Sequence, residues 1–79
     1  MGAVTVRYFA MLREQRGCVD EVVQVAEGTT VEQLYHDLFP AGPLGRLPVA
    51  YAVDQAYVGA RHLLDGASEV AFIPPVGGG

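Results

Sequence analysis

The stretch that decides the fold is residues 28–40, GTTVEQLYHDLFP. Thr29 and Glu32 have the three-residue spacing of a capping box, which predicts that a helix starts here. Apolar residues then recur at helical spacing and form one stripe: Val31, Leu34, Tyr35 and Leu38. Pro40 ends the helix because proline lacks a backbone N–H. The sequence therefore predicts one amphipathic helix whose apolar face packs against a second layer.

Five β-rich runs surround this helix: residues 4–9, 19–25, 49–53, 56–58 and 69–73. Period-two alternation in the first run separates Val4, Val6 and Tyr8 from Thr5, Arg7 and Phe9. In the second run, one parity is shared by Val19, Val23 and Val25. In the last run, Val70 and Phe72 share one face, and Ala71 and Ile73 share the other. These patterns predict strands with one buried face.

The segments between the runs predict turns. Residues 10–16 contain good helix formers and are followed by Gly17, so a short helical turn joins the first two strands as a hairpin. The pairs at 54–55 and 65–66 predict tight turns, and the proline-rich segment 40–48 predicts an irregular loop.

Because one helix covers only one face of a sheet, the order of elements predicts an α+β fold of the β-grasp type. We expect a mixed sheet of about five strands with one main helix on one face. Residues 1–73 form the expected domain. Residues 74–79 form a flexible C-terminal tail that ends in Gly-Gly.

The chain has 79 residues, which is enough for one domain. Its composition, 51% hydrophobic and 18% charged, is typical of an ordered protein. It has no apolar run long enough to span a membrane and no signal-peptide pattern, so we expect a soluble, cytoplasmic protein without a membrane partner. A single cysteine, Cys18, agrees with a reducing compartment.

The charge balance bears on partners. Nine acidic residues oppose five arginines, and the formal net charge is −4. An acidic chain without a basic cluster is a poor match for nucleic acid, and a basic protein surface suits it better. The chain also contains no lysine, so no side-chain amine of its own can intercept an activated C-terminus.

No motif of an ordinary active site is present, and no metal site is expected. Cys18, His36 and His62 are far apart in the sequence, and we interpret them as structural or solvated side chains. Three glutamates near turns or helix ends have the same interpretation: Glu14, Glu32 and Glu69.

The last six residues, PPVGGG at 74–79, are harder to explain by packing. Two prolines stop the last strand and favour an extended exit, while glycines without a Cβ can pass through a narrow channel. The reactive group that such a tail delivers is the carboxylate of Gly79. A carboxylate is ionised at neutral pH and is a poor acyl donor, so it needs activation, for example to an acyl-adenylate.

Four blocks carry a resemblance to a known family: VRYFAMLRE at 6–14, TVEQL at 30–34, AVDQ at 52–55 and LDGASEVAFIPPVGGG at 64–79. Together they resemble the MoaD-type small subunit of molybdopterin synthase, over the whole chain. The resemblance implies a ubiquitin-like β-grasp fold and a sulfur carrier that is not catalytic by itself. It also implies that Gly78 and Gly79 carry the function and that Pro74, Pro75, Val76 and Gly77 form the insertable tail.

The family's chemistry implies the partners. A MoeB-type enzyme uses ATP to adenylate Gly79, a sulfur-donating enzyme supplies the sulfur, and the resulting thiocarboxylate enters a MoaE-type large subunit in an expected heterotetramer. There the sulfur passes to precursor Z, cyclic pyranopterin monophosphate. The chain itself holds no permanent cofactor. The resemblance and the strand parity together imply four residues for the partner interface: Phe9, Arg13, Tyr57 and Ile73.

Other functions fit the same tail. One is a ubiquitin-like modifier joined to lysines of other proteins. Another is a sulfur carrier for thiamine, cysteine or tRNA thiolation. A plain interaction domain, whose tail has no role, is the last alternative.

Overall fold

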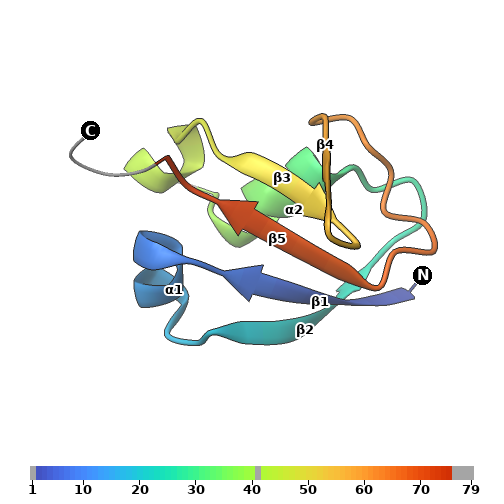
Figure 1. Ribbon diagram of the computed structural model, residues 1–79, viewed down its shortest axis with the longest axis horizontal. Helices are drawn as coiled ribbons and strands as arrows, with labels where there is room; N and C mark the ends of the chain where they lie inside the picture. The colour runs from blue at the N-terminus through green and yellow to red at the C-terminus, as the bar shows by residue number, and fades with distance from the viewer. Residues whose placement is uncertain (1, 41, 76–79) are drawn as a thin grey trace.

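The computed structural model describes residues 2–40 and 42–75. The elements are β1 (Gly2–Tyr8), α1 (Ala10–Arg16), β2 (Asp20–Val25), α2 (Val31–Leu38), the 3-10 helix η1 (Pro43–Arg46), β3 (Ala50–Val53), β4 (Ala56–Val58) and β5 (Glu69–Ile73). The strands form one sheet in the order β2-β1-β5-β3-β4. β1 and β5 are parallel, and the other pairs are antiparallel. Figure 1 shows α2 behind the sheet, while no helix covers the near face. The predicted α+β, β-grasp architecture is confirmed.

The core lies between α2 and the inner face of the sheet. β1 contributes Val4, Val6 and Tyr8, and β5 contributes Val70 and Phe72, all at most 2% exposed. The strand parity predicted for these two runs is therefore confirmed. From α2, the core receives Val31, Leu34 and Tyr35, whereas Leu38 is half-buried. The Tyr35 hydroxyl also donates to the carbonyl of Leu44, which ties α2 to η1.

The capping box of α2 lies one residue later than predicted. Thr30, not Thr29, is the N-cap, and its Oγ1 accepts the backbone N–H of Gln33 at 3.2 Å. Gln33 Oε1 in turn accepts the Thr30 N–H at 2.9 Å, so Gln33 takes the place predicted for Glu32. The loop after β4 decides the position, because its carbonyls at residues 60 and 62 accept the N–H groups of residues 32 and 31. A tertiary contact thus selects between two adjacent threonines.

Several boundaries also differ from the prediction. Phe9 lies outside β1 and is the N-cap residue of α1. Val19 lies before β2 and is 54% exposed, although its carbonyl still accepts the Tyr8 N–H at 2.9 Å. Residues 43–46, inside the predicted irregular loop, form the η1 turn. Gly17 ends α1 in a left-handed conformation, with φ 78°, as the helix-stop interpretation expects.

The tight turn between β3 and β4 is confirmed at Asp54 and Gln55, which both have positive φ. Asp54 Oδ1 accepts the N–H groups of Ser68 and Glu69, at 3.0 and 2.9 Å, and so anchors the start of β5. The division of the chain at residue 73 stays a prediction. Among the helices in residues 2–40 and 42–75, none is long and apolar enough to cross a membrane.

Candidate functional site

The candidate site forms where two parallel strands end side by side. Tyr8 of β1 is paired with Phe72 of β5, so the residues that follow leave the sheet at the same end. After β1 the chain turns into α1, and after β5 it continues through Pro74 and Pro75. Parallel pairing therefore brings α1 to the base of the predicted tail (Figure 1).

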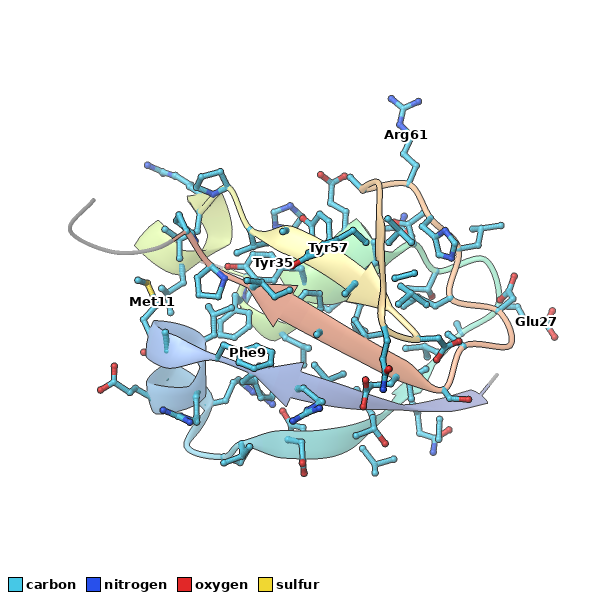
Figure 2. All side chains as sticks on the ribbon, viewed as in Figure 1. Phe9, Met11, Glu27, Tyr35, Tyr57 and Arg61 are labelled. Carbon is cyan, nitrogen blue, oxygen red and sulfur yellow. The ribbon has the colours of Figure 1, made fainter. Side chains whose placement is uncertain are left out.

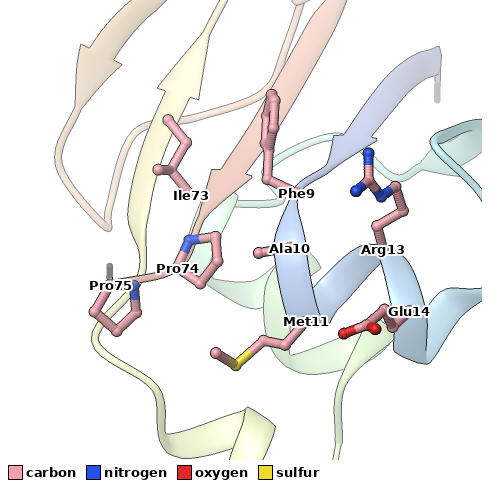
Figure 3. A pocket seen from close by; sticks show the side chains of 8 residues that line it. All are labelled: Phe9, Ala10, Met11, Arg13, Glu14, Ile73, Pro74 and Pro75. Carbon is pink, nitrogen blue, oxygen red and sulfur yellow. The ribbon is translucent and has the colours of Figure 1, made fainter. Parts of the chain in front are cut away.

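An open groove of about 840 Å³ lies between these two exits (Figure 3). We call it the tail-root groove. Its lining residues are Phe9, Ala10, Met11, Arg13, Glu14, Ile73, Pro74 and Pro75. The lining is mainly apolar, with one cationic and one anionic side chain at α1. Such a composition is typical of a protein-docking surface with a charged rim.

The structure brings together most of the predicted interface residues and Pro74 and Pro75 of the predicted tail. Phe9 is 39% exposed, Arg13 is exposed and Ile73 is half-buried. Phe9 and Ile73 do face away from the core, as their parity predicted. Pro74 is buried and Pro75 is exposed, so the chain remains packed on the domain through residue 74.

Tyr57, the fourth predicted interface residue, does not line the tail-root groove. It is 76% exposed on β4 and pairs with Ala52, which pairs with Ala71 of β5 and through it with Arg7 of β1. Tyr57 therefore shares the helix-free face of the sheet with Arg7. Figure 2 shows it away from Phe9, on the side of β3 and β4.

Between Tyr57 and Phe9, the helix-free face carries two alanines and an arginine that lies close to a glutamate. Ala52 and Ala71 are half-buried in the middle of the face. Arg7 lies 3.9 Å from the Glu69 carboxylate, and its guanidinium lies 5.9 Å from the centre of the Phe9 ring. The centre of the helix-free face thus combines small side chains with an ion pair, a composition that suits contact with another protein.

Ala10 enters α1 in a left-handed conformation, with φ 51°. This region costs a residue with a Cβ roughly 1 kcal/mol or more. The strain lies at the groove itself, because Ala10 joins the exposed Phe9 to the helix that carries Met11 and Arg13. Nothing in the sequence pattern indicated it.

A polar cluster joins α1 to β1 and β2. Tyr8 Oη donates to Glu21 Oε2 at 2.6 Å, and Arg16 donates to the same oxygen from Nε at 2.9 Å and Nη2 at 2.7 Å. The Tyr8 hydrogen bond, followed by the Arg16 bonds, lowers the pKa of Glu21, although partial burial opposes this. Burial and then the Glu21 bond raise the pKa of Tyr8 above its ordinary value. No pattern in the sequence predicted this cluster.

The other titratable candidates are dispersed. Cys18 is half-buried before β2, His36 is exposed on α2 and His62 is exposed in the loop after β4. No three His, Cys, Asp or Glu side chains within residues 2–40 and 42–75 are grouped so that they could hold a metal ion. Val76, Gly77, Gly78 and Gly79 lie outside the described residues.

Met11 and Glu14 are groove residues that the sequence analysis did not assign to the interface. Met11 and Glu14 are three residues apart in a helix that begins where a strand ends. This spacing places both side chains on one side of a helical turn, so the sequence pattern could have identified them. The partner of α1 across the groove could not be found in that way, because it depends on the parallel pairing of β1 with β5.

The model of the ThiS family matches residues 6–79. The chain belongs to the ThiS family. It is accordingly a ubiquitin-like sulfur carrier or modifier of the ThiS/MoaD type, a class of small domains that are generally non-catalytic and work with partner enzymes. The family resemblance found in the sequence is confirmed at this level. Comparison with curated proteins finds no match.

Solved structures share the fold over almost the whole chain. "Putative molybdopterin converting factor, subunit 1" from Pyrococcus furiosus has a TM-score of 0.73 and 22% identity, with 96% of this chain and 100% of that chain covered. SAMP1 from Haloferax volcanii, also described as small archaeal modifier protein 1, appears in two structures. The first has a TM-score of 0.76 and 24% identity, with 99% of this chain and 100% of that chain covered. The second has a TM-score of 0.77 and 21% identity, with 96% of this chain and 100% of that chain covered. At these identities the likeness shows the fold.

Proposed function

We propose that the chain is the sulfur carrier subunit of a molybdopterin synthase and acts in the cytoplasm. The observation that carries the proposal is the tail-root groove, an apolar docking surface at the point where a PPVGGG segment leaves the sheet. Membership of the ThiS family supports the sulfur-carrier class, and the sequence blocks at 6–14 and 64–79 favour the MoaD type.

The proposed chemistry takes place at Gly79. A carboxylate oxygen of Gly79 attacks the α-phosphate of ATP in a MoeB-type enzyme, and pyrophosphate leaves. The outer sulfur of a persulfide on a sulfur-donating enzyme then attacks the acyl carbon, AMP leaves, and an acyl disulfide forms. A thiol attacks the enzyme's sulfur, a disulfide forms between that thiol and the enzyme, and the Gly79 thiocarboxylate leaves. Inside a MoaE-type subunit this sulfur passes to precursor Z. Because the carrier supplies no catalytic constellation, the activating and receiving sites supply the positioning and charge stabilisation.

Each of the predicted site residues has a place in this proposal. Gly78 and Gly79 reach the active site, and Pro74 to Gly77 form the tail segment, in which Pro74 stays packed on the domain and the residues after it enter the channel. Four residues dock on the partner: Phe9, Arg13, Tyr57 and Ile73. The apolar groove holds the carrier while its end reacts, which converts an intermolecular reaction into one between positioned groups.

The direct test is intact-mass analysis of the protein from cells with and without the activating enzyme. We expect an oxygen-to-sulfur exchange confined to the C-terminal peptide, and only when the enzyme is present. A variant without Gly79 is expected to keep the fold and lose sulfur transfer. If the truncated chain still supports molybdopterin formation, the tail does not carry the function.

A ubiquitin-like modifier is the second candidate, because the fold similarity to SAMP1 covers 99% of this chain. In that case the activated Gly79 is attacked by a lysine amine of another protein, and AMP or a carrier thiol leaves. Isopeptide adducts in a digest, without a thiocarboxylate intermediate that feeds pterin synthesis, are the expected result. A thiocarboxylate that supports thiamine, cysteine or tRNA thiolation instead identifies a carrier for another pathway.

A further inference from the structure

α1 forms one wall of the tail-root groove but has little of its own to hold it in place. It has seven residues, no side-chain N-cap and a left-handed first residue. Leu12 is its only buried side chain. A helix of this length is marginal by itself, so its orientation depends on its tertiary contacts, which at Arg16 include a 3.5 Å bond from Nη1 to the Leu38 carbonyl.

The C-terminal end of α1 is held by a carboxylate of another element. Arg16 places Nε and Nη2 on Glu21 Oε2 of β2, at 2.9 and 2.7 Å. The same oxygen accepts the hydroxyl of Tyr8, which is 1% exposed in the core. The guanidinium also lies 5.8 Å from the centre of the Tyr8 ring. One carboxylate oxygen thus joins α1, β1 and β2.

We propose that Glu21 is a positioning residue for the tail-root groove: by holding Arg16 it sets the orientation of α1, and with it the spacing between Met11 and the exit of β5. The inference rests on the proposed function only in treating the groove as a docking site. Glu21 does not itself line the groove, so its effect on docking passes through Arg16 and α1.

Because the Arg16 and Glu21 side chains are partly exposed, we expect the loss of their ion pair to affect α1 rather than the whole domain. The Arg16 and Glu21 side chains are 31% and 30% exposed, and an ion pair of this kind contributes little to the stability of a whole domain. Leu12 keeps the middle of α1 attached when the pair is lost, so the helix can pivot about that residue. A small rotation then moves Met11 and Arg13 relative to Ile73 (Figure 3).

The first test uses the free protein and Glu21→Gln, which retains an acceptor for the Tyr8 hydroxyl. Native-state hydrogen exchange is measured at α1, where the Gly17 N–H bonds the Arg13 carbonyl at 2.9 Å, and at the sheet. We expect α1 amides to exchange roughly 2- to 5-fold faster relative to sheet amides, because the free energy that a partly exposed ion pair contributes corresponds to a change of this size in the opening equilibrium. The methyl signals of Met11 and Ile73 are expected to shift as well.

Three further variants separate positioning from charge. Glu32→Gln on α2 removes the same charge away from the groove and is expected to leave α1 exchange and both methyl signals unchanged. Arg16→Lys retains the charge but loses the two-point contact, and is expected to fall between the wild type and Arg16→Gln. Equal acceleration of α1 and sheet amides in Glu21→Gln, or unchanged groove signals, overturns the positioning role.

The second test measures the affinity of the same variants for the MoeB-type activating enzyme from the same organism. Glu21→Gln is expected to weaken binding by roughly 2- to 10-fold, mainly through faster dissociation, while Glu32→Gln binds as the wild type does. Unchanged affinity of Glu21→Gln overturns the inference. If the wild-type chain does not bind the enzyme, the proposed function fails, and the exchange data still decide whether Glu21 positions α1.

Discussion

The two α-helices of the described residues, α1 and α2, differ in how they are held. α2 has a side-chain capping box at its N-terminus and buries Val31, Leu34 and Tyr35 in the core. α1 begins without a side-chain cap at a strained residue and buries Leu12 alone. The well-held helix completes the core, and the weakly held helix carries the groove. The two helices thus differ in how many core side chains they supply, three from α2 and one from α1, and Arg16 Nη1 links them by donating to the Leu38 carbonyl at 3.5 Å.

The largest expected effect comes from emptying the core beneath α2. Leu34→Ala removes a side chain that is 3% exposed and is expected to lower the free energy of unfolding by about 2–5 kcal/mol. Met11→Ala, which truncates a half-buried side chain of α1, is expected to cost only about 1 kcal/mol. Urea denaturation of both variants measures the difference. Equal losses contradict the division between the helices.

The capping box of α2 is expected to contribute about 1 kcal/mol. Thr30→Ala removes the acceptor for the Gln33 N–H, so its unfolding midpoint in urea is expected to fall accordingly. Thr29→Ala is the matched control, because Thr29 has the sequence spacing of the box but not the bond. We expect its effect to be within about 0.5 kcal/mol of zero. A larger loss at Thr29 contradicts the assignment of the cap.

The anchor of α1 is expected to make stability depend on acid pH. The pKa of Glu21 is lowered in the folded state by the bonds from Tyr8 and Arg16, so its contribution is present above the ordinary carboxyl pKa. That contribution is lost as the pH falls from the ordinary value of 4.5 through the lower folded value. Because the side chains are partly exposed, it amounts to under about 1 kcal/mol.

Thermal unfolding as a function of pH measures this effect. Glu21→Gln is expected to have a flatter profile below the ordinary carboxyl pKa than the wild type. Tyr8→Phe, which removes the leading cause of the pKa shift, is expected to flatten it as well. An unchanged acid slope in Glu21→Gln means that the anchor of α1 contributes no stability through its charge.

The smallest expected effect is a gain from relieving strain at the entry to α1. Ala10→Gly removes the cost of a Cβ at φ 51°, and the greater freedom of glycine in the unfolded chain offsets part of it, leaving a gain of roughly 0.5 kcal/mol. Gln15→Gly, at an exposed position within the same helix, is the control and is expected to lose about 1 kcal/mol. If Ala10→Gly lowers the free energy of unfolding, the positive φ of Ala10 is not a source of strain.

The sequence predicted the parts of the fold that depend on local patterns. Val70 and Phe72 alternate with Ala71 and Ile73, and this parity alone separates the core face from the face that carries the groove. The choice between Thr29 and Thr30 as the cap could not be made in this way, since two carbonyls of the loop after β4 decide it.

The site was predictable in its composition but not in its assembly. Phe9 and Ile73 were identified by parity and Arg13 by family resemblance, whereas Met11 and Glu14 join them only because parallel strands end together. The Tyr8–Glu21–Arg16 cluster joins residues 13 positions apart along the chain. Sequence spacing says nothing of such a contact before the register of β1 and β2 is known.

The parallel pairing of β1 with β5 has a mechanical consequence. Because the two strands run in the same direction, a pull on the chain after β5 against the start of β1 loads their hydrogen bonds in shear. All bonds along the shared length then carry the force together, whereas an antiparallel pair pulled from one end opens one bond at a time. A pull of this kind on the end of β5 is therefore resisted by the whole β1–β5 ladder at once, whereas the antiparallel β3–β5 ladder is loaded from the Ala50–Ile73 pair inward.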